Sequence, residues 1–128
     1  MNDLDIAQYA ARAANWESRR YFVRELEVVH VRPRHVADAP WRLFAPLQSD
    51  SDAAELAAAA RIDVSHYDAY VAAIAGVGSM RIFTHDDIDV ERLPDWDCAE
   101  RRRAMRRAIS ECAAFIGRDL GPLWWRKT

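Results

Sequence analysis

The most regular apolar pattern in this 128-residue chain runs from residue 97 to residue 120. Its apolar residues recur at intervals of three, four or seven positions, which places them on one face of an α-helix. They are Cys98, Met105, Ile109, Cys112, Ile116 and Leu120. Asp97 and Glu100 have the spacing of a capping box at the helix start, and Gly121 followed by Pro122 favours its end. The apolar face of this helix must be covered, so we expect the other elements to pack around it.

Both cysteines of the chain, Cys98 and Cys112, lie on this predicted helix. They are 14 residues apart in the sequence, so their Cα atoms should be separated by about 21 Å at a rise of about 1.5 Å per residue. A disulfide requires less than about 7 Å between these atoms. We therefore expect no bridge between them, and we interpret both as small buried side chains in a reducing compartment.

The apolar runs of the sequence are short, far below the roughly 20 residues that a membrane-spanning helix needs. Near the start of the chain, Asp3 and Asp5 stand where a secretion signal would be basic. We therefore expect a cytoplasmic protein without a membrane association.

Near residue 21 the chain changes from a helical to a strand-like composition. Residues 3–20 are rich in alanine, with acids at the start and arginines at the end, and this pattern predicts a helix. Its apolar face comprises Ile6, Tyr9, Ala10, Ala13 and Trp16. The next residues are dense in β-branched and aromatic side chains, and we predict a strand from about residue 22 to residue 32.

The apolar residues of this predicted strand do not keep to one face. Leu26 and Val28 share one parity, whereas Val29 and Val31 share the other. This pattern predicts a bulge, or a strand that is buried on both faces at one end. A helix that continues as far as Leu26 is a second interpretation of the first residues of the segment.

A proline-rich connection follows. Pro40 and Pro46 bracket residues 41–44, which we interpret as a short strand or as a packed anchor. We expect the side chains of Trp41 and Phe44 to be inside.

Two short helices and a strand are predicted in the middle of the chain. Asp52 begins an alanine-rich helix over residues 53–61, and Ser65 caps another over residues 66–75. The apolar face of the second of these helices comprises Tyr67, Tyr70, Val71 and Ile74. Residues 80–83 are expected to form a strand.

Together these elements predict an α+β fold in a single globular domain that spans residues 1–128. Four helices, dominated by the long C-terminal one, would pack on a small sheet of two or three strands. With 51% hydrophobic and 30% charged residues, the composition agrees with one core that needs no metal or disulfide.

Charge is distributed unevenly along the chain, although the net charge is only −2. Residues 51–100 hold 3 arginines against 11 acids, whereas residues 101–128 hold 8 bases against 2 acids. The basic side chains of the long helix form a contiguous band beside its apolar face. This arginine band consists of Arg102, Arg103, Arg106 and Arg107. The band has three interpretations: a solvated face with internal ion pairs, a surface for a protein partner, or a nucleic-acid surface.

Several features disfavour the nucleic-acid interpretation. Glu111 can pair with Arg107 and Glu100 with Arg103, so the helix compensates part of its own charge. The chain is acidic overall and has a single lysine. The two short predicted helices invite comparison with a helix-turn-helix, but the turn lacks glycine and the second helix lacks arginine and lysine.

The sequence contains no motif typical of a nucleophilic elbow, a zinc protease, a P-loop or a dinucleotide site. His30, His35 and His85 lie near acidic residues, but their spacing matches no standard zinc or calcium site. We predict no catalytic residue, no metal and no cofactor. A metal-assisted enzyme that uses these histidines is kept as a third hypothesis.

Five tryptophans, a polarised charge and the lack of a catalytic set favour a protein that acts by binding. We expect a non-catalytic module for a protein or peptide partner, as an accessory subunit of a larger enzyme or as a small inhibitor or immunity protein. The arginine band would contact the partner together with Trp124 and Trp125, in a tail that either folds back or docks on another chain. Residues 85–91 would form a second, acidic patch. The alternative function is a small nucleic-acid-binding regulator that uses the arginine-rich helix, and both homo- and hetero-oligomers are open.

Overall fold

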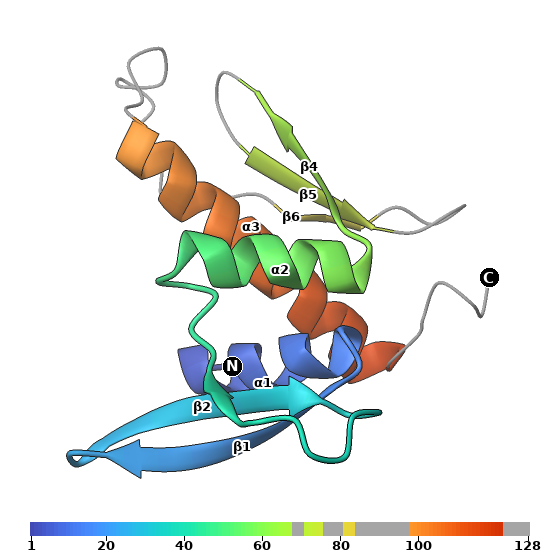
Figure 1. Ribbon diagram of the computed structural model, residues 1–128. Coiled ribbons are helices and arrows are strands. Elements are labelled where there is room, and N and C mark those ends of the chain that lie inside the picture. Colours follow the sequence, from blue (N-terminus) through green and yellow to red (C-terminus); the bar gives the residue numbers. More distant parts are fainter. Residues whose placement is uncertain (68–70, 76–80, 84–97, 122–128) are drawn as a thin grey trace.

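The computed structural model describes residues 1–67, 71–75, 81–83 and 98–121 (Figure 1). In these ranges the helices are α1 (Asp3–Ala13), α2 (Asp50–Ala60) and α3 (Cys98–Asp119). The strands are β1 (Trp16–Val23), β2 (Leu26–Pro33), β3 (Arg42–Leu43), β4 (Asp63–His66), β5 (Val71–Ala75) and β6 (Arg81–Phe83). They form two antiparallel sheets, in the orders β1-β2-β3 and β4-β5-β6. The predicted α+β class is confirmed, with three helices in the described ranges rather than four.

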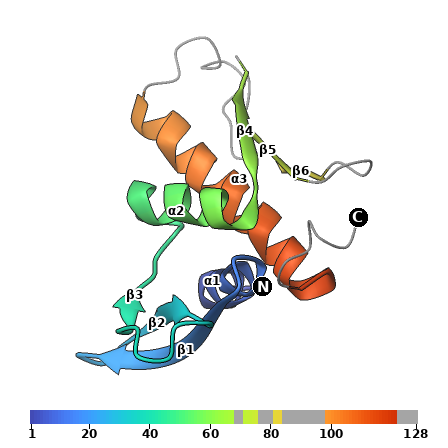
Figure 2. The ribbon, with the colours of Figure 1, turned by 45° about the vertical axis from the view of Figure 1, so that its right-hand side comes forward.

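Helix α3 lies at the centre of the described molecule and contacts α1, α2 and β5. Figure 2 shows α1 and the β1-β2-β3 sheet on one side of it and the β4-β5-β6 sheet on the other. Of the predicted apolar face, Ile109, Cys112 and Ile116 are buried and Met105 is partly buried. Leu120 is 43% exposed. The prediction was wrong for this residue because it follows the last helical residue and so leaves the apolar face.

Both ends of α3 are close to the predicted ends. The helix begins at Cys98, whereas Asp97, the predicted cap, lies outside the described residues. At the other end Gly121 has a φ of 78°, in the left-handed region. The backbone N–H groups of Leu120 and Gly121 both donate to the C=O of Ile116, at 2.8 and 2.9 Å. Gly121 therefore ends the helix as the sequence predicted.

Helices α1 and α3 approach each other closely at Gly117. A Cβ atom at this position would lie 1.7 Å from the backbone oxygen of Tyr9. On α1, the neighbouring Ala10 and Ala13 are fully buried. Small side chains on both helices therefore allow the two backbones to pack against each other, and the alanine face of α1 becomes part of the core.

Helix α1 is shorter than the helix predicted over residues 3–20. It starts with a capping box between Asn2 and Asp5 and ends at Ala13. Asn15 then has a φ of 61°, and Trp16 already belongs to β1. The prediction extended the helix too far, because a composition rich in alanine and arginine does not reveal a left-handed residue that turns the chain.

The strand predicted over residues 22–32 is part of the hairpin β1–β2. Val23 pairs with Leu26 across a two-residue turn. The turn residues Arg24 and Glu25 have φ values of 50° and 68°. Two consecutive residues at positive φ are the pattern of a type I′ hairpin turn.

The hairpin register also explains the mixed parity of the apolar residues. Val29 and Val31 are 2% and 1% exposed and belong to the core on the α1 side of the sheet. Leu26 and Val28 alternate with them and therefore lie on the opposite, outer face. The predicted bulge is wrong, because β2 pairs with β1 without interruption from Leu26 to Pro33. The helix continuing to Leu26 is also wrong, because a turn lies at Arg24 and Glu25.

Residues 41–44 contain the short strand β3, which agrees with one of the two interpretations of this segment. Phe44 is 2% exposed, as predicted. Trp41 is only partly buried. Its indole ring is covered by the guanidinium groups of Arg19 and Arg32, each 4.4 Å from the ring centroid. Arginine side chains thus replace the apolar core that the sequence suggested around Trp41.

Helix α2 starts earlier than predicted because Ser49, not Asp52, caps it. The Ser49 hydroxyl accepts the backbone N–H of Asp52 at 3.2 Å. The Asp52 carboxylate accepts the backbone N–H of Ala45 at 2.9 Å and so holds the preceding loop to the helix. The helix ends at Ala60, with Arg61 in the left-handed region.

The helix predicted over residues 66–75 is wrong, since this segment forms the end of β4 and the whole of β5. Four of the five residues of β5 are buried, and the strand packs against α3. Tyr67 is exposed, and Tyr70 lies outside the described residues. A short apolar run has no clear period, so its packing partner decides its structure. Strand β6 confirms the strand predicted over residues 80–83, as far as the structure describes it.

Candidate partner-binding surface

Two side chains of the arginine band hold α3 to the start of α2. The side chain of Arg106 is 17% exposed and donates to the Asp50 carboxylate at 2.6 Å and to the backbone C=O of Leu47 at 3.1 Å. Arg102 reaches the other oxygen of Asp50 at 3.3 Å. The hydrogen bond from Arg106, with the charges of both arginines, holds the pKa of Asp50 below its usual value despite some desolvation. These arginines are therefore engaged within the protein.

The other two arginines of the band differ from each other in their contacts. Arg107 donates to Glu111 at 2.8 Å, which confirms the predicted pair, and it lies 3.6 Å from Asp3 of α1. Arg103 is exposed to solvent. Of the predicted band, one arginine remains fully available to a partner.

Other predicted contact residues fall outside the described part of the chain. These are Trp124, Trp125 and the acidic residues 85–91. Their contribution to binding stays a prediction.

The three histidines that the structure describes do not form a group. His30 stacks on Tyr21, with ring centroids 5.0 Å apart, whereas His35 and His66 are exposed. His85 is outside the described residues. Among the residues that the structure describes, no three histidine, cysteine or acidic side chains form a group that could hold a metal ion.

An aromatic and arginine cluster covers the outer face of the β1-β2-β3 sheet. Arg19 lies over Trp41, at 4.4 Å, and over Tyr21, at 5.1 Å, measured to the ring centroids. Tyr21 in turn stacks on His30. Arg32 also lies over Trp41 and forms an ion pair with Glu17. The cluster gives this face contacting tryptophan, tyrosine and arginine side chains, the types that most often anchor interfaces.

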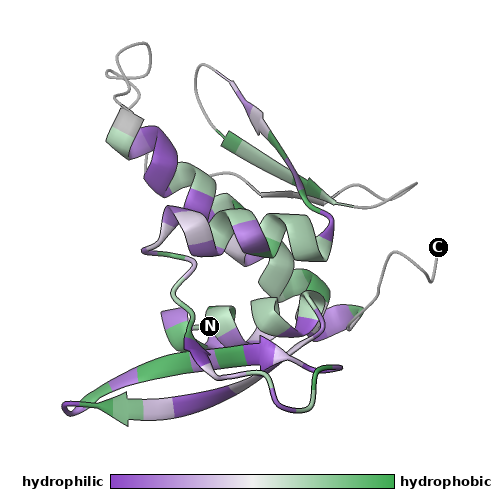
Figure 3. Cartoon of the chain, viewed as in Figure 1, coloured by the Kyte–Doolittle hydropathy of each residue, from purple (hydrophilic) through white to green (hydrophobic). Residues whose placement is uncertain are grey.

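The turn end of the same hairpin is apolar and exposed. Four of the nine exposed large hydrophobic residues in the described part of the chain lie within three residues of the turn, and a fifth lies on β3 opposite His30. Their exposures are 45 to 67%. They are Tyr21, Phe22, Val23, Leu26 and Leu43, and we call them the hairpin patch. Figure 3 shows hydrophobic colouring on both strands beside the turn. Scattered single hydrophobic residues are ordinary on a surface, but a gathered set is typical of an interaction site.

A groove of about 480 Å³ adjoins the hairpin patch. It lies between the start of α1, strand β2 and residues 43–48, and most of its exposed lining is apolar. The lining includes Leu4, Leu26, Val28, Leu43, Phe44 and Leu47. Asp3 and Glu27 are its charged lining residues. Leu26 and Leu43 belong to both the groove and the hairpin patch, so the two form one continuous surface.

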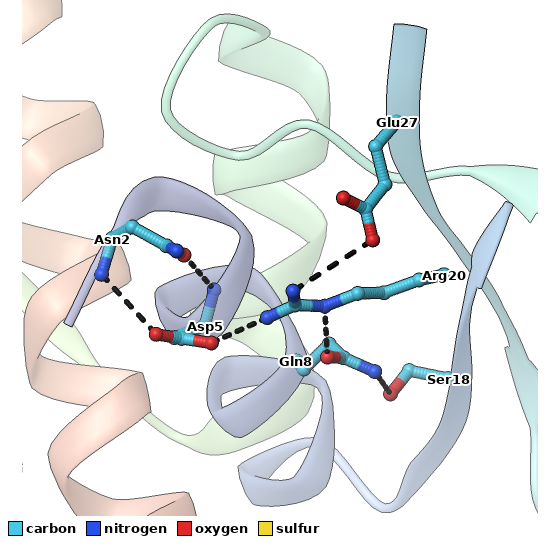
Figure 4. Close-up of polar contacts among 6 residues, drawn as sticks. All are labelled: Asn2, Asp5, Gln8, Ser18, Arg20 and Glu27. Atoms are coloured by element: carbon cyan, nitrogen blue, oxygen red, sulfur yellow. Dashed lines mark hydrogen bonds and ion pairs between the residues drawn. The ribbon is translucent and has the colours of Figure 1, made fainter. Parts of the chain in front are cut away.

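A polar network fixes the hairpin to α1 beside this groove (Figure 4). The Arg20 guanidinium donates to Gln8 at 2.8 Å, forms an ion pair with Asp5, and lies 3.7 Å from Glu27. Gln8 donates in turn to the hydroxyl of Ser18, at 3.4 Å. Since Arg20 joins α1, β1 and β2, it holds the position of Glu27 at the groove.

A second hollow, between α1 and the start of β1, has a polar lining. Its two acidic residues are committed to ion pairs, Asp5 with Arg20 and Glu17 with Arg32, and its basic residues are Arg12 and Arg34. The lining contains one serine, Ser18, and no histidine or cysteine. No nucleophile next to a base is found in it, so the hollow does not have the arrangement of an acyl-transfer site.

Sequence reasoning missed the hairpin patch. The signal was the polar pair Arg24 and Glu25, which interrupts the apolar run between Val23 and Leu26. A turn at this pair would have paired Val23 with Leu26 and placed both on one exposed end.

No family model, no curated protein and no solved structure matches the chain. None of the helices in the described part of the chain combines the length and the apolar composition that crossing a bilayer demands.

Proposed function

We propose that this protein is a non-catalytic module that binds a protein or peptide partner through the hairpin patch and the adjoining groove. Accessory subunits, inhibitors and immunity proteins all act in this way. The observation that carries the proposal is the gathering of exposed apolar side chains at the end of one hairpin, next to an apolar groove.

The energetics of burial support this location. Phe22 and Leu26 are 66% and 67% exposed, although each could contribute roughly 1.5–3 kcal/mol if fully buried. In the described structure neither side chain gains that energy from the fold. Phe22 pairs with Glu27 and so lies on the opposite face of the hairpin from Leu26. A partner that encloses the turn end would cover both and gain most of this energy, which is enough to dominate a small interface.

The neighbouring aromatic and arginine cluster supports the same surface. Trp41 and Tyr21 are held by contacts to Arg19, so they lose little conformational freedom when a partner covers them. Rigid aromatic anchors beside an apolar patch are the usual anatomy of a protein interface.

The nucleic-acid alternative has less support. It relied on the arginine band of α3, where Arg102 and Arg106 bind Asp50 and Arg107 binds Glu111. A phosphate backbone would have to break these pairs before it could use the charges.

The proposal can be tested by capture of the partner from lysate on immobilised protein. In the double variant Phe22→Thr/Leu26→Thr, threonine keeps the strand preference but removes the apolar surface. We expect this variant to lose the partner that the wild type captures. Val36→Thr is the matched control, because Val36 is an exposed apolar residue in the loop after β2, outside the hairpin patch. Equal capture by the double variant, with an unchanged circular dichroism spectrum, would rule out this surface.

A further inference from the structure

The structure contains an unpaired strand edge inside the groove, and we infer that the partner contributes an extended peptide segment that adds a strand to it. We further infer that this segment has alternating apolar side chains and a basic residue. The inference rests on the proposed function and specifies the chemistry of the partner at that site.

The free edge follows from the hydrogen bonding of β2. In the described ranges β3 pairs only with His30 and Val31, and the N–H of Phe44 donates to the C=O of Val29 at 2.9 Å. Backbone groups alternate in direction along a strand, so the N–H and C=O of Glu27 point to the same side as the C=O of Val29. β3 does not extend along β2 as far as Glu27, and no described strand pairs with Glu27 on this side.

The shape of the groove suits an extended chain. Its volume of about 480 Å³ lies within the roughly 300–1,000 Å³ typical of ligand sites. Residues 43–48 and the start of α1 form its other walls. In strand addition the main-chain hydrogen bonds supply affinity, and alternate side chains enter pockets beside the edge. Leu26, Leu43 and Phe44 line the groove and would receive the inward-pointing side chains.

The charge of the groove selects a basic peptide. Its lining contains Asp3 and Glu27 and no arginine, lysine or histidine. Each acid has one arginine within ion-pair distance, Arg107 at 3.6 Å from Asp3 and Arg20 at 3.7 Å from Glu27, but both contacts are longer than a normal hydrogen bond. The side chain of Asp3 is 61% exposed, so its oxygens can accept hydrogen bonds from a lysine or an arginine of the partner.

The first step of the test is selection from a random heptapeptide library displayed on phage, with the full-length protein as bait. We expect enriched peptides in which apolar residues alternate with other residues and at least one lysine or arginine occurs. The double variant Phe22→Thr/Leu26→Thr is the counter-bait. Failure to enrich any peptide over this counter-bait, or enrichment of apolar residues at helical spacing, would overturn the inference.

The second step measures affinities of the enriched peptide by fluorescence polarisation. Methylation of one backbone nitrogen removes a donor without changing a side chain. In strand addition it should weaken binding about tenfold at the position whose N–H donates to the C=O of Glu27 and little elsewhere, because the open edge argued above lies at Glu27. Asp3→Asn/Glu27→Gln should reduce the preference for the basic peptide over its lysine-to-glutamine analogue about tenfold, whereas Asp63→Asn, on β4, should not change it. Equal effects at all positions, or an unchanged preference, would contradict the inference.

A second copy of the chain is the competing occupant. Sedimentation velocity should show a monomer. If it shows a dimer that Leu26→Thr dissociates, the groove binds a second copy of the chain and the inferred peptide is wrong.

The experiments distinguish a failure of the inference from a failure of the proposed function. If partner capture depends on Phe22 and Leu26 but no peptide is enriched, the binding function stands and the strand addition is wrong.

Discussion

Gly117 is the residue at which the packing of α1 on α3 leaves no room for a side chain, since an added Cβ atom would lie 1.7 Å from the backbone oxygen of Tyr9. We predict that Gly117→Ala lowers the free energy of unfolding by about 3 kcal/mol, because one of the two helix backbones must move. Urea denaturation followed by circular dichroism measures the change. In an uncrowded helix the same substitution would stabilise the protein by about 1 kcal/mol, and a gain of this sign would contradict the close approach.

Asp50 is the residue at which two arginines of α3 meet α2. Its pKa is lowered from 3.8 mainly by the hydrogen bond from Arg106. A lowered pKa in the folded state stabilises the protein above the unfolded value of 3.8, and this stabilisation is lost as the pH falls through the folded pKa.

We therefore predict that Asp50→Asn lowers Tm at pH 7 and that the difference from the wild type disappears in strong acid, below the folded pKa. Thermal unfolding between pH 7 and pH 2 measures this. Asp63→Asn is the control, because Asp63 is exposed and forms no ion pair within the described residues. A constant difference across the whole pH range would show that the ion pairs do not stabilise the fold.

Single residues with a local cause were predicted well from the sequence. Gly121 ends α3, and Arg107 pairs with Glu111 one helical turn away. Residues whose surroundings come from distant segments were predicted less well. Trp41 was expected in the core, but Arg19 and Arg32 reach it from the neighbouring strands of the sheet.

Among the elements, the β1–β2 hairpin depends most on its turn. Glu25 has a φ of 68°, in the left-handed region where glycine has no steric penalty. We predict that Glu25→Gly raises the free energy of unfolding by about 1 kcal/mol, measured by urea denaturation. Ala58→Gly, at an exposed position within α2, should instead lower it by about 1 kcal/mol. If Glu25→Gly also destabilises the protein, the residue lies within a strand and the turn is misplaced.

The elements differ in how far the sequence could predict them. Helix α3 has an extended period and a clear stop signal, so its bounds were nearly correct. Strand β5 is a short run of alanine, valine and isoleucine, which suits a helix as well as a strand. Its contact with α3 decides the outcome, and a contact between residues so far apart in the chain leaves no local pattern.

In the molecule as a whole, polar and apolar surfaces have different uses. The arginine band of α3 mainly joins helices: Arg102 and Arg106 hold α2, and Arg107 reaches α1. Among the described residues, most of the exposed large hydrophobic side chains lie on the hairpin and on β3 beside it, four of them at the turn end of the hairpin. Binding at that end would therefore leave the contacts around α3 intact.

The partner-binding surface predicted from the sequence differs from the hairpin patch proposed from the structure. Composition indicated a binding protein rich in aromatic and arginine side chains, but it assigned the contacts to the arginine band and to Trp124 and Trp125. Three arginines of the band proved to be engaged by Asp50 and Glu111, which lie near them only after folding or one turn along the helix, whereas Arg103 is exposed. The hairpin patch arises from strand pairing, so it needed the register of β1 and β2.

The most direct test of the central claim is the dissociation constant of the captured partner for three forms of the protein, measured by isothermal titration calorimetry. We predict that Phe22→Thr/Leu26→Thr raises Kd by tenfold or more, because about 1.5–3 kcal/mol of apolar burial is lost at each position. Val36→Thr should leave Kd within about twofold of the wild type, as expected for a residue outside the interface. An unchanged Kd for the folded double variant would contradict the claim that the hairpin patch is the partner-binding surface.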